Sequence, residues 1–125
     1  MSGLLLGLPF SWRQRRLALT RSPMSQSEFV RQIVDEGGDA SAAAAVWDHL
    51  KDWILVDGLT PYPTDDLAVV YGLAEEELEE DLILDILQRL GVPIPGRKVL
   101  ADFDAVWTPL DVAVLVARSR VSASE

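Results

Sequence analysis

His49, the only histidine of the chain, is the first residue to consider for acid–base or nucleophilic chemistry. A catalytic histidine needs a nucleophile on one side and an orienting carboxylate on the other. Asp48 and Asp52 are its acidic neighbours in the sequence. On a helix, residue i+1 does not face residue i, and residue i+3 can only share a surface with it. We therefore expect His49 to be a surface or boundary histidine, and no catalytic residue is predicted.

The acidic run from Glu75 to Asp81 could be a site for a hard cation, because calcium and magnesium take carboxylate oxygens as ligands. An EF-hand loop alternates its acids around a central glycine, whereas consecutive acids on a helix point in different directions. The run is also explained as a solvated face that the positive end of a helix dipole favours. The functional prediction is a docking surface for a basic partner, with no metal site. Its predicted partner-binding residues are Asp65, Asp66, Glu75, Glu76, Glu79 and Glu80.

Other reaction types lack the residues that they need. With no cysteine, the chain has no disulfide, no thiolate and no cysteine-based zinc site. Gly37-Gly38 lacks the strand and the lysine of a phosphate-binding loop. Trp47, Trp53 and Trp107 could line an apolar pocket, but tryptophan at helical spacing usually packs in a core. We predict that the protein is not an enzyme and holds no cofactor.

The charge of the chain is unevenly distributed along its length. Residues 1–24 contain four arginines and no acid, whereas residues 25–125 contain seven basic and twenty acidic side chains, a net charge of −13. Such a body repels nucleic acid and anionic lipid, and a basic protein surface is its natural partner. A cysteine-free chain also suits a reducing cytoplasm, and we expect a cytoplasmic protein.

The length of 125 residues suits one domain, which we place at residues 25–118, with a frayed tail at 119–125. The apolar stretch Gly3–Phe10 is too short to span a bilayer, which takes about 20 residues. Its position before the arginines is the reverse of a secretory signal. Residues 1–24 are therefore expected to be a disordered tail outside the fold, or an over-extended start with Met24 as the initiator. An organelle transit peptide is the alternative.

Helical periodicity dominates residues 25–118. A capping box at Ser25 to Glu28 opens one helix, which Gly37-Gly38 ends. A second helix starts at Asp39 or Ser41 and runs to about Val56.

The rest of the chain continues the helical pattern. Thr64 is expected to cap a short helical turn that Gly72 closes, and residues 75–90 give the strongest periodic signal. Residues 98–103 can form one short turn, and Thr108-Pro109-Leu110-Asp111 opens a last helix. No alternating strand pattern competes with these signals. The predicted fold is all-α, a small bundle of about four helices.

From about Ala43 to Ala117 the order of these features resembles the acyl carrier protein family. The motifs that carry the resemblance are Thr64-Asp65-Asp66-Leu67, Tyr71-Gly72, Asp81-Leu82-Ile83-Leu84, Gly91-Val92-Pro93-Ile94-Pro95 and Thr108-Pro109-Leu110-Asp111-Val112. The chain is similar to small bacterial proteins of this kind. The resemblance implies a four-helix carrier scaffold that partner proteins recognise.

One departure from the family is decisive for the chemistry. In the family, a serine in an Asp-Ser-Leu motif at the start of the second helix carries the phosphopantetheine arm. Glu75-Glu76-Glu77-Leu78 stands in that region here, and no serine occurs between Ser41 and Ser119. We therefore expect an acidic carrier-like module that acts through protein–protein interaction. The alternative is a genuine acyl or small-ligand carrier with an apolar pocket between its helices.

Overall fold

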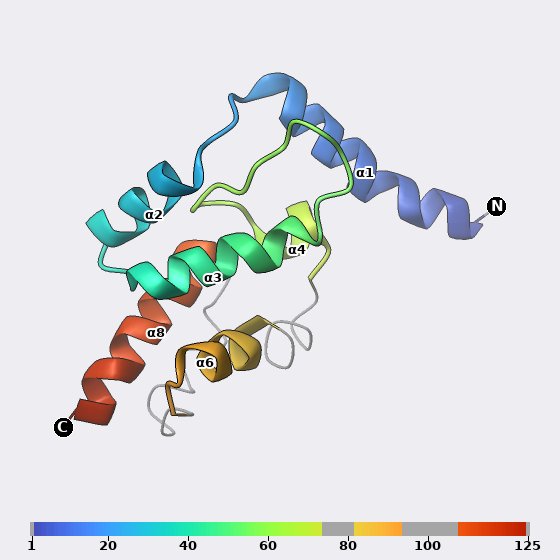
Figure 1. Cartoon of the computed structure of the whole chain (residues 1–125). Helices are drawn as coiled ribbons and strands as arrows, with labels where there is room; N and C mark the ends of the chain where they lie inside the picture. The colour runs from blue at the N-terminus through green and yellow to red at the C-terminus, as the bar shows by residue number, and fades with distance from the viewer. Residues whose placement is uncertain (1, 74–81, 94–107, 125) are drawn as a thin grey trace.

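A computed structural model describes residues 2–73, 82–93 and 108–124 of the chain, and Figure 1 shows its arrangement. Within these ranges the chain is helical and forms no strand. The helices are α1 (Ser2–Thr20), α2 (Gln26–Asp35), α3 (Ala40–Lys51), α4 (Leu67–Tyr71), α6 (Leu84–Leu90) and α8 (Pro109–Ser124). The prediction of an all-α protein is confirmed.

Helix α3 is the centre of the described structure, because α2, α6 and α8 all contact it, whereas α1 contacts α4 (Figure 1). The apolar faces of these helices meet in one core, as their helical periodicity predicts. The fully buried side chains of this core include Phe29, Ile33, Val46, Leu50, Leu67, Ile86 and Val112. Trp47 belongs to the core as predicted, and its ring meets that of Phe29 edge-on, with centroids 5.2 Å apart.

The ends of α2 and the start of α3 follow from local sequence signals. The hydroxyl of Ser25 accepts a hydrogen bond from the backbone N–H of Glu28 at 3.1 Å, as expected for a capping box. Asp39 caps α3 by accepting from the N–H of Ala42 at 2.9 Å. Between the two helices, a Cβ atom on Gly38 would lie 2.4 Å from Cγ2 of Ile33. A glycine is therefore required in the turn between α2 and α3, where the backbone of residue 38 passes close to the side chain of Ile33.

Helix α3 ends at Lys51, whereas the sequence predicts a helix to about Val56. The difference comes from a tertiary contact. The side-chain amide of Gln14 donates to the carbonyl of Trp53 at 3.0 Å, and its oxygen accepts from the N–H of Leu55 at 2.6 Å. Because the backbone groups of residues 53 and 55 bond to α1, they are not used to extend α3.

The short helix α4 also starts differently from the prediction. Its cap is Asp66, which accepts from the N–H groups of Ala68 and Val69, both at 3.0 Å. The prediction that Thr64 is the cap is wrong, because a carboxylate immediately before the helix already takes the free N–H groups. Gly72 ends α4 with a φ of +73°, in agreement with the sequence.

Helices α6 and α8 agree with the sequence where they are described. Leu82, Ile83, Ile86 and Leu87 are buried, as the periodicity of residues 75–90 predicts. Residues 75–81 of that predicted helix, the expected turn at 98–103 and Trp107 lie outside the described residues. At the start of α8, Thr108 and Asp111 exchange two hydrogen bonds, each of 3.1 Å, which confirms the predicted cap.

Two segments that the sequence places outside the fold are helical. The tail expected to fray from residue 119 continues α8 as far as Ser124. Ser119 is buried there, and its hydroxyl donates to the carbonyl of Leu115 at 2.9 Å. Residues 2–20 of the expected disordered segment form α1, which is anchored to the rest of the chain through Gln14. Because Gln14 is polar, the apolar periodicity of the sequence does not predict that it is buried against the rest of the chain.

None of the described helices is long and apolar enough to cross a membrane.

Candidate functional site

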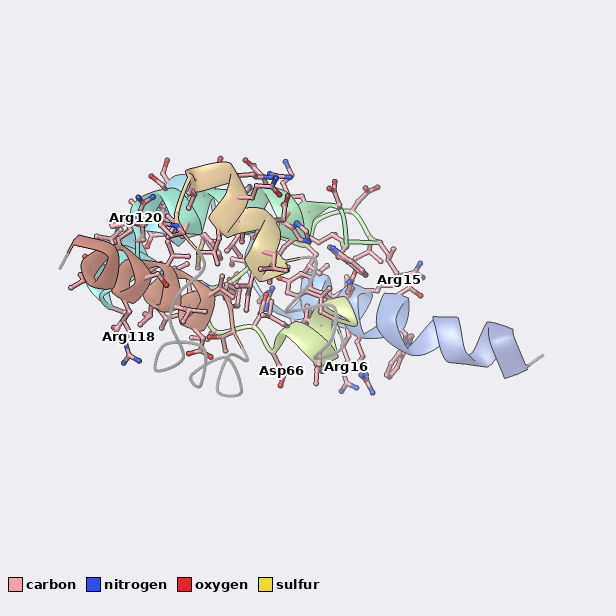
Figure 2. The ribbon with its side chains drawn as sticks, turned by 90° about the horizontal axis from the view of Figure 1, so that it is seen from below. Arg15, Arg16, Asp66, Arg118 and Arg120 are labelled. Atoms are coloured by element: carbon pink, nitrogen blue, oxygen red, sulfur yellow. The ribbon has the colours of Figure 1, made fainter. Side chains whose placement is uncertain are left out.

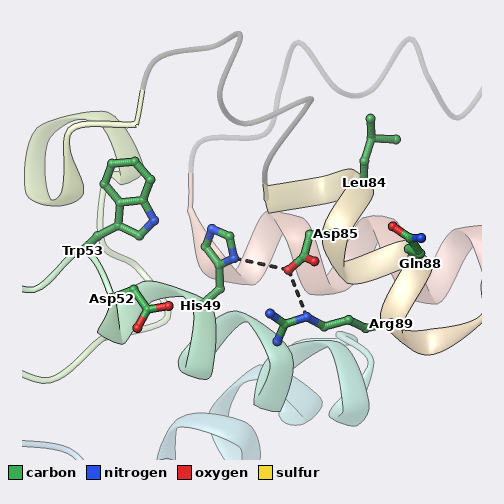
Figure 3. A pocket seen from close by; sticks show the side chains of 7 residues that line it. All are labelled: His49, Asp52, Trp53, Leu84, Asp85, Gln88 and Arg89. Carbon is green, nitrogen blue, oxygen red and sulfur yellow. Dashed lines mark ion pairs between the residues drawn. The ribbon is translucent and has the colours of Figure 1, made fainter.

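A pocket of about 590 Å³ opens to solvent between the end of α3 and helix α6 (Figure 3). We call it the histidine pocket. It is lined by His49, Asp52, Trp53, Leu84, Asp85, Gln88 and Arg89. Five of these seven side chains are polar or charged, so the pocket is not the apolar cavity that an acyl chain would need.

His49, Asp85 and Arg89 form a connected group in this pocket. The Nδ1 atom of His49 lies 3.4 Å from Oδ2 of Asp85, and Nε of Arg89 lies 3.0 Å from the same oxygen (Figure 3). The Nε2 atom of His49 is buried and has no hydrogen-bond partner among the described residues. Asp85 and Arg89 come from one face of α6 because they are four residues apart.

This arrangement supplies an imidazole beside a carboxylate but no hydroxyl or thiol nucleophile. The lining contains no serine, threonine or cysteine among the described residues. The carboxylate beside His49 comes from Asp85 on α6, 36 positions along the chain. It is neither Asp48 nor Asp52, the two acids that lie near His49 in the sequence. Asp48 is exposed to solvent, and Asp52 lines the pocket without an ion pair to His49. The described residues also contain no group of three acids or histidines suited to a metal ion.

Two of the six predicted partner-binding residues, Asp65 and Asp66, lie in the described part of the chain. Asp65 is buried, with 5 % of its surface exposed, and is held inside the chain. Asp66 is exposed but is engaged as the cap of α4. Glu75, Glu76, Glu79 and Glu80 lie outside the described residues.

Asp65 is the centre of a second polar group, which we call the Asp65 cluster: Arg21, Tyr62, Asp65 and Tyr71. Arg21 binds the carboxylate with both terminal nitrogens, at 2.6 and 3.0 Å. The hydroxyl of Tyr71 and the backbone N–H of Tyr62 also donate to it. The guanidinium of Arg21 lies 3.9 Å from the centroid of the Tyr62 ring. A carboxylate with this many donors is a structural group and is closed to a partner.

Burial and charge shift the pKa values in this cluster. Burial of the Tyr71 side chain, reinforced by the negative charge of Asp65, raises the pKa of its hydroxyl far above the ordinary value. Burial acts to lower the pKa of Arg21, but hydrogen bonding and attraction to Asp65 outweigh it and raise that pKa. Both shifts keep Tyr71 neutral and Arg21 charged at physiological pH.

The chain matches no protein-family model, no curated protein and no solved structure. The resemblance to acyl carrier proteins therefore depends on the sequence motifs. Sequence reasoning did not find the partnership of His49 with Asp85. The spacing of Asp85 and Arg89 was visible, but nothing local to His49 pointed to α6.

Proposed function

We propose that this chain is a non-catalytic, acidic, carrier-protein-like helical bundle that acts in the cytoplasm by binding a basic surface on a partner protein. The observation that carries the proposal is the excess of acid, a net charge of −13 over residues 25–125. The proposed contact residues remain Asp66 and the glutamates Glu75, Glu76, Glu79 and Glu80. Asp65 is withdrawn from this set because Arg21 already neutralises it.

The distribution of ion pairs supports this proposal. Four arginines of the described residues are bound to carboxylates of the same chain: Arg21 to Asp65, Arg31 to Glu28, Arg89 to Asp85 and Arg120 to Asp39. Exposed acids remain that have no ion pair within the described part of the chain, namely Glu36, Asp48, Asp52 and Asp57. Uncompensated surface carboxylates attract a basic partner over several ångströms and accelerate its association.

Two other functions have less support. The histidine pocket has an imidazole and a carboxylate but no hydroxyl or thiol among its described lining residues, so it does not supply the nucleophile of a catalytic triad. A carrier of acyl groups would need the modified serine, and the segment between Ser41 and Ser119 contains none.

The proposal is tested by affinity capture from a lysate of the source cells. The native chain is compared with a variant in which Glu75, Glu76, Glu79 and Glu80 are all changed to glutamine. We expect a partner with a basic surface to be retained by the native chain, lost by the variant and released by salt, because screening weakens attraction between exposed charges.

A charge-matched control separates a defined surface from net charge. In this control Asp35, Glu36, Asp48 and Asp57, which are all exposed, are changed to their amides. Its net charge equals that of the glutamine variant, so it should associate with the partner more slowly but still retain it, because these four acids are not among the proposed contact residues. Equal loss from both variants would show that only net charge matters, and equal capture by all three proteins would contradict the proposal.

A further inference from the structure

Helix α1, from residue 11 to its end at Thr20, and Arg21 directly after it present two opposite faces. One face is turned towards the rest of the protein, and its four side chains are buried or partly buried at helical spacing. These inner residues are Gln14, Leu17, Ala18 and Arg21. Such an i, i+3, i+4, i+7 spacing marks one side of a helix.

The opposite face has the same spacing and is exposed. We call it the outer stripe, and it consists of Trp12, Arg15, Arg16 and Leu19. Trp12 has 61 % of its surface exposed and Leu19 has 82 %. The guanidinium of Arg16 lies 5.5 Å from the centroid of the Trp12 ring. The outer stripe combines exposed apolar side chains with arginines, and α1 contains no acid. This surface therefore differs in charge and in apolarity from the acidic surface of the remaining chain.

The N-terminal half of α1 extends away from the body. Figure 1 shows this half projecting beyond the other helices, and Figure 2 shows Arg15 and Arg16 near the point where it leaves them. The sequence of this half, Gly3–Phe10, contains no charged residue, and the first acid of the chain is Glu28. Along the helix, an uncharged segment is therefore followed by a tryptophan and then by arginines.

We propose that the outer stripe of α1 is a docking surface for an anionic lipid bilayer. Helices that lie in the membrane interface combine arginine with tryptophan and leucine. Arginines bind lipid phosphates, while tryptophan sits at the boundary between headgroups and hydrocarbon. The outer stripe offers each of these groups on one side of one helix, with Trp12 and Leu19 exposed beside the two arginines.

The acidity of the body does not prevent this contact. The inner face of α1 holds the body on the side of the helix away from the lipid. An α-helix with its side chains is about 10 Å thick, and the Debye length at physiological ionic strength is about 8 Å. Repulsion between the body and the phosphates is therefore screened, whereas the arginines of the outer stripe touch the phosphates directly.

Charge and apolarity together favour lipid over other anionic partners. A nucleic acid offers phosphates but no apolar phase for Leu19. A second copy offers carboxylates, but its exposed apolar side chains, such as Leu55 and Leu84, are scattered over several elements. The bilayer interface offers phosphates for the arginines and a continuous apolar phase for Trp12 and Leu19.

The test is co-sedimentation of the full chain with vesicles. Vesicles of phosphatidylcholine are compared with vesicles that also contain phosphatidylglycerol. We expect binding to the anionic vesicles only. Changing Arg15→Gln together with Arg16→Gln should lower the partition coefficient about thirty-fold, which corresponds to about 1 kcal/mol for each arginine near an anionic surface. A second variant, Trp12→Gln with Leu19→Gln, should also lose binding.

A matched control removes two positive charges from other helices. Lys51 and Arg118 are both exposed, and changing both to glutamine should leave vesicle binding within two-fold of the native chain. Circular dichroism checks that each variant keeps its helices. Failure of the native chain to bind anionic vesicles, or an equal loss in the control, would overturn the proposal. Self-association that needs Arg15 and Arg16, without vesicle binding, would also overturn it and assign the stripe to a second copy.

Discussion

The Asp65 cluster and the histidine pocket contain similar groups in different surroundings. In the cluster, the carboxylate side chain is 4 % exposed and receives hydrogen bonds from Arg21, Tyr71 and the backbone of Tyr62. In the pocket, the side chain of Asp85 is 34 % exposed, and Arg89 beside it is 53 % exposed. The arginine–carboxylate pair is therefore buried in the Asp65 cluster, whereas in the histidine pocket it is partly exposed to solvent.

This difference decides what each region can do. Removing one partner of a buried ion pair strongly destabilises the folded protein, whereas an exposed ion pair contributes little to its stability. The cluster joins α1, the loop before α4 and α4 itself, so its groups are committed to stability. The pocket opens to solvent, and the exposed side chain of Arg89 there remains available for binding.

The largest effect is expected from Asp65→Ala. The substitution leaves the guanidinium of Arg21, 17 % exposed, without its carboxylate and leaves the hydroxyl of Tyr71 without an acceptor. We expect the free energy of unfolding to fall by about 3 to 5 kcal/mol, the usual cost of breaking a buried ion pair. Urea denaturation followed by circular dichroism measures it.

The control for Asp65→Ala is Asp57→Ala, in an exposed position without an ion pair in the described part of the chain. It should change stability by less than about 0.5 kcal/mol. Similar values for the two variants would show that the cluster contributes no more than a surface carboxylate.

A second test compares a buried glutamine on α1 with an exposed one at the histidine pocket. The side chain of Gln14 is fully buried and bonds the carbonyls of Trp53 and Val70 and the N–H of Leu55. Gln14→Ala leaves these backbone groups unpaired, and we expect a loss of about 3 kcal/mol. Gln88→Ala, at the exposed edge of the histidine pocket, should cost less than about 0.5 kcal/mol. The same urea titration measures both, and equal losses would show that burial does not distinguish the two side chains.

The sequence predicted those parts of the fold that depend on local signals. The capping box at Ser25, the left-handed Gly72 and the Thr108–Asp111 cap are set by residues within a few positions of one another. The buried faces of α2, α3 and α6 follow from helical periodicity in the same way.

Contacts between distant polar residues could not be predicted in this way. Gln14 and Val70 are 56 positions apart, Arg21 and Asp65 are 44 apart, and His49 meets an acid on another helix. A glutamine or an arginine in the sequence is normally a surface residue, so its burial has no signature until its partner is known. For this reason α1 was placed outside the fold, and Asp65 was assigned to the surface.

A smaller effect than that of Asp65→Ala is expected from Tyr71→Phe, which removes one donor from the Asp65 cluster and leaves Arg21 in place. We expect a loss of about 1.5 kcal/mol at neutral pH, typical of a hydrogen bond to a charged group. Its diagnostic feature is the dependence of stability on pH. Because burial raises the pKa of Tyr71 above the ordinary value of 10.0, the unfolded chain releases this proton at a lower pH than the folded chain does.

Above about pH 10 the unfolded state therefore binds fewer protons at this site than the folded state, and the free energy of unfolding must fall as pH rises. Below that pH both states keep the proton, and Tyr71 contributes no slope. Urea titrations at increasing alkaline pH should show a steeper fall for the native chain and for Tyr62→Phe than for Tyr71→Phe. Parallel curves for all three proteins would mean that the hydroxyl of Tyr71 is not held neutral by its surroundings. The Asp65 cluster would then be as open to solvent as the histidine pocket.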